Sequence, residues 1–180
     1  MNILEELELQ YERLAAFLAA IEDETTEFNR LADGKDTQAI RRMKCRVIFS
    51  CIESYISHLK QSAIMFSIDR PDLFSPAEIL ALNDEESYVN GKGEATTRSA
   101  RIKLQDNLRL AFGSIARALD HDFPIDFGDT EAQCFTESVK IRNRLTHPKQ
   151  ATDLVVNDVE SHNIDRAWIW FTKHLANVIK

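Results

Sequence analysis

Apolar residues recur along most of this chain at intervals of three, four and seven positions, the spacing that gathers side chains on one face of an α-helix. An irregular insertion at about residues 69–96 interrupts the pattern, with a short helix from 76 to about 82 and no convincing pair of strands. The expected fold is therefore all-α, an antiparallel bundle of five to six helices in one domain, 1–180. Its long helices are predicted at about 3–31, 37–68, 97–119, 130–146 and 158–179.

Turn and capping residues mark the ends of these helices. Gly34 suits the left-handed conformation that often follows a helix end. Pro148 should end the fourth long helix, because its ring disfavours the helical conformation in the residue before it. Helix starts are indicated by capping side chains at four places: Asp36 or Thr37, Ser75 with Glu78, Thr130 with Gln133, and Asn157 with Glu160.

Composition narrows the class of protein. Of 180 residues, 44% are hydrophobic and 28% charged, which is typical of a folded globular domain. No apolar run approaches the ~20 residues that span a bilayer, and the acidic start at residues 1–6 does not resemble a secretory signal. The three cysteines form no Cys-x-x-Cys pair, so we expect buried, reduced thiols. We therefore predict a cytoplasmic protein with no membrane partner.

The net charge of −7 limits the way in which this chain could hold nucleic acid. Proteins that bind a duplex through many phosphate contacts are usually basic, because neutralising phosphates and releasing their counterions supplies the affinity. Any nucleic-acid contact should therefore be a local basic site on an acidic protein, with modest and salt-sensitive affinity.

Candidate chemistry is concentrated between Lys140 and Lys149. Arg142 carries a permanent forked charge that suits a phosphate, and His147 can give or take a proton near neutral pH. On an unbroken helix the two would be rotated by about 140°, but loosening of the helix before Pro148 would let the imidazole turn toward Arg142. Together they could cleave RNA without a metal.

The run Arg142-Asn143-Arg144-Leu145-Thr146-His147 resembles the signature of the HEPN superfamily, an arginine, a polar residue and then a histidine. Its place near the last helical hairpin of an all-α chain is also similar to HEPN proteins. The resemblance implies a metal-independent endoribonuclease that leaves 2′,3′-cyclic phosphate and 5′-hydroxyl ends. It implies that Arg142 and His147 are catalytic and that Asn143 orients them. Lys140, Arg144 and Lys149 would support the site or bind substrate.

The same resemblance implies partners. HEPN proteins of this kind act as homodimers in which two motifs meet in one cleft, so a second chain would supply the second histidine. RNA would be the substrate and no cofactor or metal would be needed. Many relatives act in toxin–antitoxin, abortive-infection or CRISPR-associated defence. We therefore expect a bacterial toxin–antitoxin, abortive-infection or stress system, with an antitoxin or nucleotidyltransferase as partner.

Two alternatives stay open. The chain could be a non-catalytic helical module that binds nucleotide or RNA or that dimerises, or a structural partner protein. In that case Lys140, Arg144 and Lys149 would be a solvated helix face that complements the C-terminal dipole. His147 would cap the last carbonyls, and Arg142 would pair with Glu137 or with Glu53, an acid placed among the apolar positions of the second helix.

Other chemistry-bearing residues are expected to be structural. The Trp168 and Trp170 pair should serve core and dimer packing rather than base stacking. The remaining histidines lie singly, without carboxylates or cysteines at ligand spacing, so no metal site is predicted. They are His58, His121, His162 and His174.

Overall fold

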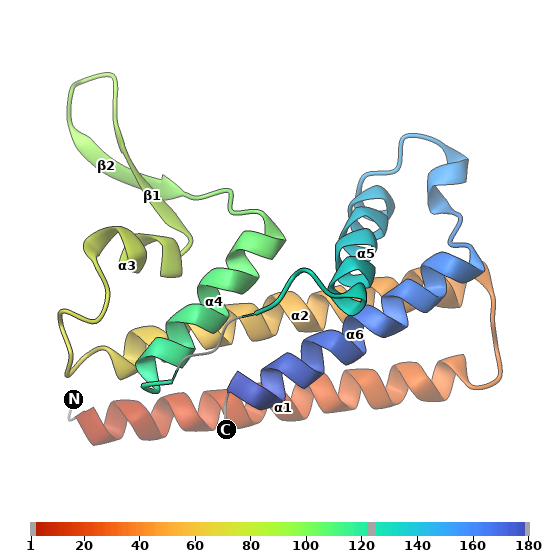
Figure 1. The fold of residues 1–180 in the computed structure, drawn as a ribbon, viewed down its shortest axis with the longest axis horizontal. Coiled ribbons are helices and arrows are strands. Elements are labelled where there is room, and N and C mark those ends of the chain that lie inside the picture. Colours follow the sequence, from red (N-terminus) through yellow and green to blue (C-terminus); the bar gives the residue numbers. More distant parts are fainter. Residues whose placement is uncertain (1–2, 122–124, 179–180) are drawn as a thin grey trace. The chain divides into compact units, whose positions relative to one another are not determined.

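The computed structural model describes residues 3–121 and 125–178, with the backbone alone at residues 3–8, 10, 11 and 14. Within these residues the chain forms six α-helices, a short 3₁₀ helix and a two-stranded sheet (Figure 1). No helix in the described ranges is long and apolar enough to cross a bilayer. The elements are α1 (Ile3–Ala32), α2 (Gln38–Phe66), α3 (Pro76–Leu82), β1 (Glu85–Val89), β2 (Ala95–Ser99), α4 (Leu104–Ala118), α5 (Thr130–Thr146), η1 (Ala151–Leu154) and α6 (Asp158–Val178).

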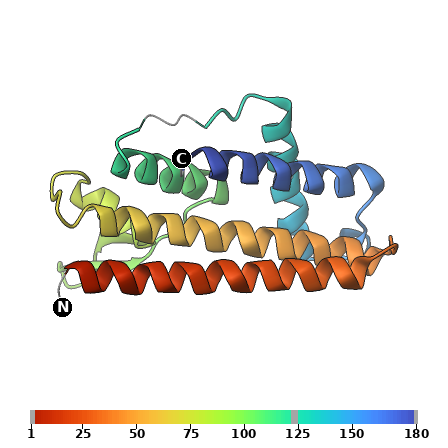
Figure 2. The same cartoon turned by 90° about the horizontal axis from the view of Figure 1, so that it is seen from below.

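Four long helices lie where the periodicity predicts them. The bounds of α1, α2, α5 and α6 agree within two residues with the expected ranges, except that residue 179 lies outside the described residues. Gly34 takes a left-handed φ of 64° in the turn after α1, and the first half of α2 runs back along α1 (Figures 1 and 2). The predicted caps at Ser75 with Glu78 and at Asn157 with Glu160 are confirmed by reciprocal hydrogen bonds.

The prediction of a helix at 97–119 without strand pairs was wrong over its first part. Residues 95–99 form β2, which pairs antiparallel with β1, and α4 begins only at Leu104. The turn explains the difference: Gly93 has a φ of 80°, and the Asn90 side chain accepts hydrogen bonds from the backbone of Lys92 and Glu94. This turn chemistry favours a hairpin, and the β-branched threonines of β2 suit a strand.

The start of α5 also differs from the prediction. Asp129, not Thr130, caps the helix, because its carboxylate accepts a hydrogen bond from the Ala132 N–H at 2.6 Å. Aspartate is among the strongest capping residues, and its negative charge is favourable beside the positive end of the helix dipole. Thr130 is consequently the first residue of the helix.

The chain divides into two compact units, where the sequence predicts one domain. The first comprises residues 1–54 and 126–177, and the second comprises residues 55–125 with 178–180. The second unit contains α3, the hairpin and α4, so it includes the whole irregular insertion. Its buried Lys60, which is 1% exposed, donates to Asp84 at 2.6 Å and to Asn107 at 3.0 Å, joining α2, the α3–β1 turn and α4.

Aromatic side chains from α2, α5, α6 and the segment before α5 form the core of the first unit. Trp170 of α6 is fully buried, and its ring centroid lies 5.0 Å from that of Phe135 on α5 and 5.3 Å from that of Phe127. Phe135 in turn lies 6.1 Å from Phe49 of α2. Trp168 is half-buried and stacks on Phe171 at 6.0 Å. The core role expected for the tryptophans is therefore clear for Trp170.

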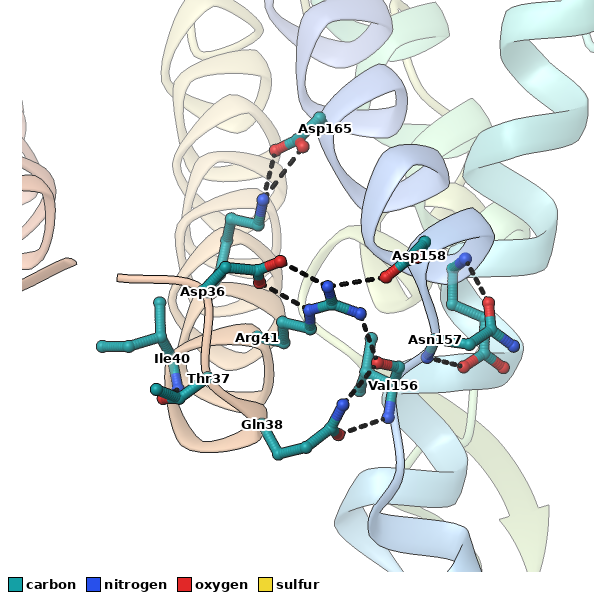
Figure 3. A network of polar contacts seen from close by, with 11 residues as sticks. Asp36, Thr37, Gln38, Ile40, Arg41, Val156, Asn157, Asp158 and Asp165 are labelled. Atoms are coloured by element: carbon teal, nitrogen blue, oxygen red, sulfur yellow. Dashed lines mark hydrogen bonds and ion pairs between the residues drawn. The ribbon is translucent and has the colours of Figure 1, made fainter. Parts of the chain in front are cut away.

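A polar network ties the start of α2 to the start of α6 (Figure 3). The Arg41 guanidinium points at the carboxylates of Asp36 and Asp158 and at the Val156 carbonyl, to which it donates at 3.0 Å. Gln38 exchanges two hydrogen bonds with the Val156 backbone. The hydrogen bond from Arg41 lowers the pKa of Asp36. These contacts hold the segment that follows α5 in a defined position.

Candidate active site

The candidate site lies at the C-terminal end of α5, in the first unit. The helix ends at Thr146, as predicted from Pro148, and His147 leaves the helical conformation with φ −128° and ψ 60°. The His147 N–H still donates to the Asn143 carbonyl at 3.1 Å, and the Thr146 hydroxyl donates to the Arg142 carbonyl at 2.8 Å. These bonds satisfy carbonyls that the end of a helix leaves open.

The imidazole of His147 is exposed to solvent. Within the part of the chain that the structure describes, its side chain takes part in no hydrogen bond or ion pair, and only its backbone caps the helix. The alternative in which the imidazole caps the last carbonyls is therefore not what the structure shows. An exposed imidazole at a helix end is accessible to a substrate.

Arg142 is held by two side chains. Its Nη2 donates to Glu53 Oε1 of α2 at 2.5 Å, and its Nη1 donates to Asn143 Oδ1 at 3.0 Å. The Arg142 side chain is 31% exposed and the Glu53 side chain 41% exposed. The pairing with Glu53 is one of the two that the sequence offered, but Glu53 is partly exposed rather than buried. The guanidinium is thus oriented while the side chain as a whole stays partly exposed.

Arg144 faces a different set of partners. It donates to Glu160 through Nη1 at 2.8 Å and Nη2 at 3.1 Å, and to the carbonyls of Asp153 and Val155. Hydrogen bonds and the charge of Glu160 raise the pKa of Arg144. Burial alone would raise the pKa of Glu160, but its bonds from Arg144 and from the Asn157 N–H outweigh it and lower that pKa. Arg144 therefore fastens the segment after α5 to the start of α6.

The two lysines at the ends of the stretch differ in their contacts. Lys140 forms a surface ion pair with Glu137 at 2.6 Å, one turn earlier on α5. Such exposed pairs contribute little to stability. The Lys149 side chain is exposed, while its backbone N–H donates to Asp153 at 2.8 Å. Of the predicted site residues, the structure thus brings Arg142 and Asn143 into contact and directs Arg144 and Lys140 elsewhere.

Two arginines of α2, one that contacts the end of α5 and one that contacts η1, were missed by the sequence analysis. Arg46 Nη2 lies 3.5 Å from the Leu145 carbonyl, and Arg42 Nη1 donates to the Leu154 carbonyl at 3.0 Å. Arg42, Arg46 and Glu53 are spaced by four and seven positions, so they share one face of α2. That spacing could have indicated a shared polar face on α2, but it does not indicate which helix that face contacts.

Cys45 lies among these charges without being reactive. Its side chain is fully buried, and burial raises the pKa of its thiol to about 12 against the opposing effect of Arg142, Arg46 and Arg144. A thiolate is the nucleophilic form, so Cys45 is not suited to attack a substrate. Cys51 is also buried, whereas Cys134 is only half-buried. Within the described residues no three His, Cys, Asp or Glu side chains are grouped so that they could hold a metal.

The site therefore combines a proton-transfer group with fixed positive charge at one helix end. His147 can move a proton, and Arg142 and Arg46 can bind anionic oxygens. Comparisons of the chain with protein-family models, with curated proteins and with solved structures find no match.

Proposed function

We propose that this chain is an endoribonuclease that cleaves RNA without a metal and leaves 2′,3′-cyclic phosphate and 5′-hydroxyl ends. The observation that carries this proposal is the exposed His147 imidazole at the end of α5, the helix whose last turns also carry Arg142 with its guanidinium oriented by Glu53 and Asn143. The resemblance of residues 142–147 to the HEPN signature supports the same reaction and a HEPN-like fold.

The reaction needs two proton transfers and one stabilised charge. A base removes the proton of the ribose 2′-hydroxyl, whose oxygen attacks the adjacent phosphorus. The bond from phosphorus to the 5′-oxygen breaks, and an acid protonates that oxygen as it leaves. His147 would transfer protons and Arg142 would stabilise the negative charge that develops on the phosphorane oxygens.

A homodimer fits this chemistry, because one imidazole cannot readily act as base and acid in the same step. A second chain would bring a second His147 to the cleft, so that one imidazole starts neutral and the other protonated. A bacterial defence or stress system, with an antitoxin or nucleotidyltransferase partner, is the setting that the resemblance supports.

The test is to incubate the purified protein with a mixed RNA pool in excess EDTA and to map the new ends. We expect cleavage that EDTA does not inhibit, with cyclic phosphate on the 3′ ends and free hydroxyls on the 5′ ends. Cleavage that EDTA abolishes, or ends that carry a 5′-phosphate, would contradict the proposed reaction.

The ion pair between Arg142 and Glu53 favours a second candidate function, a non-catalytic module that binds RNA. An arginine engaged by a carboxylate at 2.5 Å has a structural role of its own and is partly neutralised. In that case the protein would bind RNA without cutting it, and the end-mapping experiment would show intact RNA beside measurable binding.

Replacing Glu53 by glutamine should raise the affinity for RNA about fivefold, because the amide keeps an acceptor for Arg142 but removes a negative charge beside the phosphate. The measurement is fluorescence anisotropy with a labelled RNA and the cleavage-deficient His147→Ala chain. Glu137→Gln, which removes the exposed acid paired with Lys140, is the matched control and should change the affinity less. Weaker binding by Glu53→Gln would instead mean that the carboxylate orients Arg142 for binding.

A further inference from the structure

Three exposed basic side chains stand out at the end of α5: Arg46, His147 and Lys149. None of them has a carboxylate partner among the residues that the structure describes. The motif arginines behave differently, since Arg142 is paired with Glu53 and Arg144 with Glu160. Positive charge that the protein itself does not neutralise is therefore gathered beside the proposed catalytic histidine.

Arg46 is the member of this group that α2 holds in a defined place. Its Nη2 lies 3.5 Å from the Leu145 carbonyl, two residues before His147. That distance is at the long limit of a hydrogen bond, so the contact locates the guanidinium without using it strongly. The guanidinium has five N–H donors, and most of them remain available to a ligand.

Electrostatics places Arg46 in the same neighbourhood as the motif arginines. The charges of Arg142, Arg46 and Arg144 all act on the thiol of Cys45, each in the direction that lowers its pKa. Cys45 precedes Arg46 on α2, so the three guanidinium groups lie near enough to one short stretch of that helix for their charges to act on it. Glu53 and Glu160 compensate the charges of Arg142 and Arg144, so Arg46 is the member of the three whose charge no carboxylate pairs within the described residues.

We propose that Arg46 binds a second phosphate of a single-stranded RNA, next to the phosphate that Arg142 and His147 cleave. The proposal rests on the proposed function and adds its substrate class. A guanidinium binds a phosphate through two parallel hydrogen bonds, and one such contact beside the scissile bond fixes the register of the strand. A single strand fits because few cations are available here, whereas a duplex requires many phosphate contacts.

The test measures how the affinity for RNA depends on salt concentration, under conditions in which the RNA is not cleaved. A labelled single-stranded RNA is titrated by anisotropy with the full-length His147→Ala chain and with the same chain carrying Arg46→Gln, Arg46→Lys or Arg13→Gln. Arg13 is an exposed arginine of α1, so its variant controls for the loss of one positive charge. Thermal unfolding of each variant checks that the fold is intact.

We expect Arg46→Gln to weaken binding about fivefold and to reduce the slope of log affinity against log salt by about 0.7, the value for one lost phosphate contact on a single strand. Arg46→Lys should keep the slope because it keeps the charge, while it loses affinity because it loses the fork. Equal effects of Arg46→Gln and Arg13→Gln on affinity and slope would overturn the inference.

Cleavage of the same RNA is also measured with the chain that keeps His147. This measurement separates a failure of the proposed nuclease activity from a failure of the proposed phosphate site at Arg46. Binding that depends on Arg46 without any cleavage would support the phosphate site and contradict the nuclease. If Arg46→Gln changes neither the cleavage rate nor the RNA affinity, the result would support the nuclease and overturn the role of Arg46. Absence of RNA binding by every variant would overturn both.

Discussion

The rate of RNA cleavage should fall by about 10²–10⁴-fold when His147 is replaced by alanine, the loss typical of removing a general acid–base group. Alanine removes the imidazole but leaves the backbone N–H that bonds to the Asn143 carbonyl, so the helix end keeps its cap. The side chain is exposed and its removal creates no cavity. Single-turnover cleavage of a labelled RNA, with protein in excess, measures the effect on the chemical step.

His162→Ala is the matched control for this experiment. His162 is an exposed histidine on α6, outside the stretch from Lys140 to Lys149, so its loss should leave the cleavage rate unchanged. Thermal unfolding should give the same midpoint for both variants and the parent chain. Cleavage by His147→Ala at the parent rate, with the same ends, would remove His147 from the mechanism.

Replacing Arg144 by glutamine should lower the free energy of unfolding by about 2–3 kcal/mol, because it leaves a partly buried carboxylate and two carbonyls without their donor. The Glu160 side chain is 19% exposed, and Arg144 is its ion-pair partner within the described residues. For a chain of this size the loss corresponds to a fall in Tm of about 4–12 °C. Circular dichroism during heating measures it.

Arg142→Gln is the control variant for the loss of stability predicted for Arg144→Gln. Its ion pair with Glu53 is more exposed, so its removal should change stability by less than about 1 kcal/mol while it reduces cleavage. The pKa of Glu160 is lowered in the folded protein, so its contribution to stability is present above its ordinary pKa of 4.5 and is lost as pH falls below it. Acid sensitivity in that range should therefore be smaller in Arg144→Gln. Equal losses of stability in both variants would contradict the separate roles.

The helices and the end of α5 could be predicted because they depend on neighbours in the sequence. Periodic apolar residues define α1, α2, α5 and α6, and the restriction that Pro148 places on His147 acts within one residue. The hairpin of β1 and β2 could not be recognised from periodicity, because its strands bury little and show no alternation. The sequence feature that could have predicted the hairpin was the turn around Asn90 and Gly93, but the same residues are equally typical of an exposed loop.

The amino-acid sequence by itself determined which groups could perform chemistry and that they follow one another along one helix end. Only the tertiary structure decided how the charges are used. Arg142 and Arg144 lie two residues apart on α5, yet one meets Glu53 of α2 and the other Glu160 of α6, and Arg46 approaches the Leu145 carbonyl from α2. These partners depend on how the helices pack, because residues two positions apart on a helix face different neighbours. A long side chain pairs with whichever carboxylate that packing brings within reach.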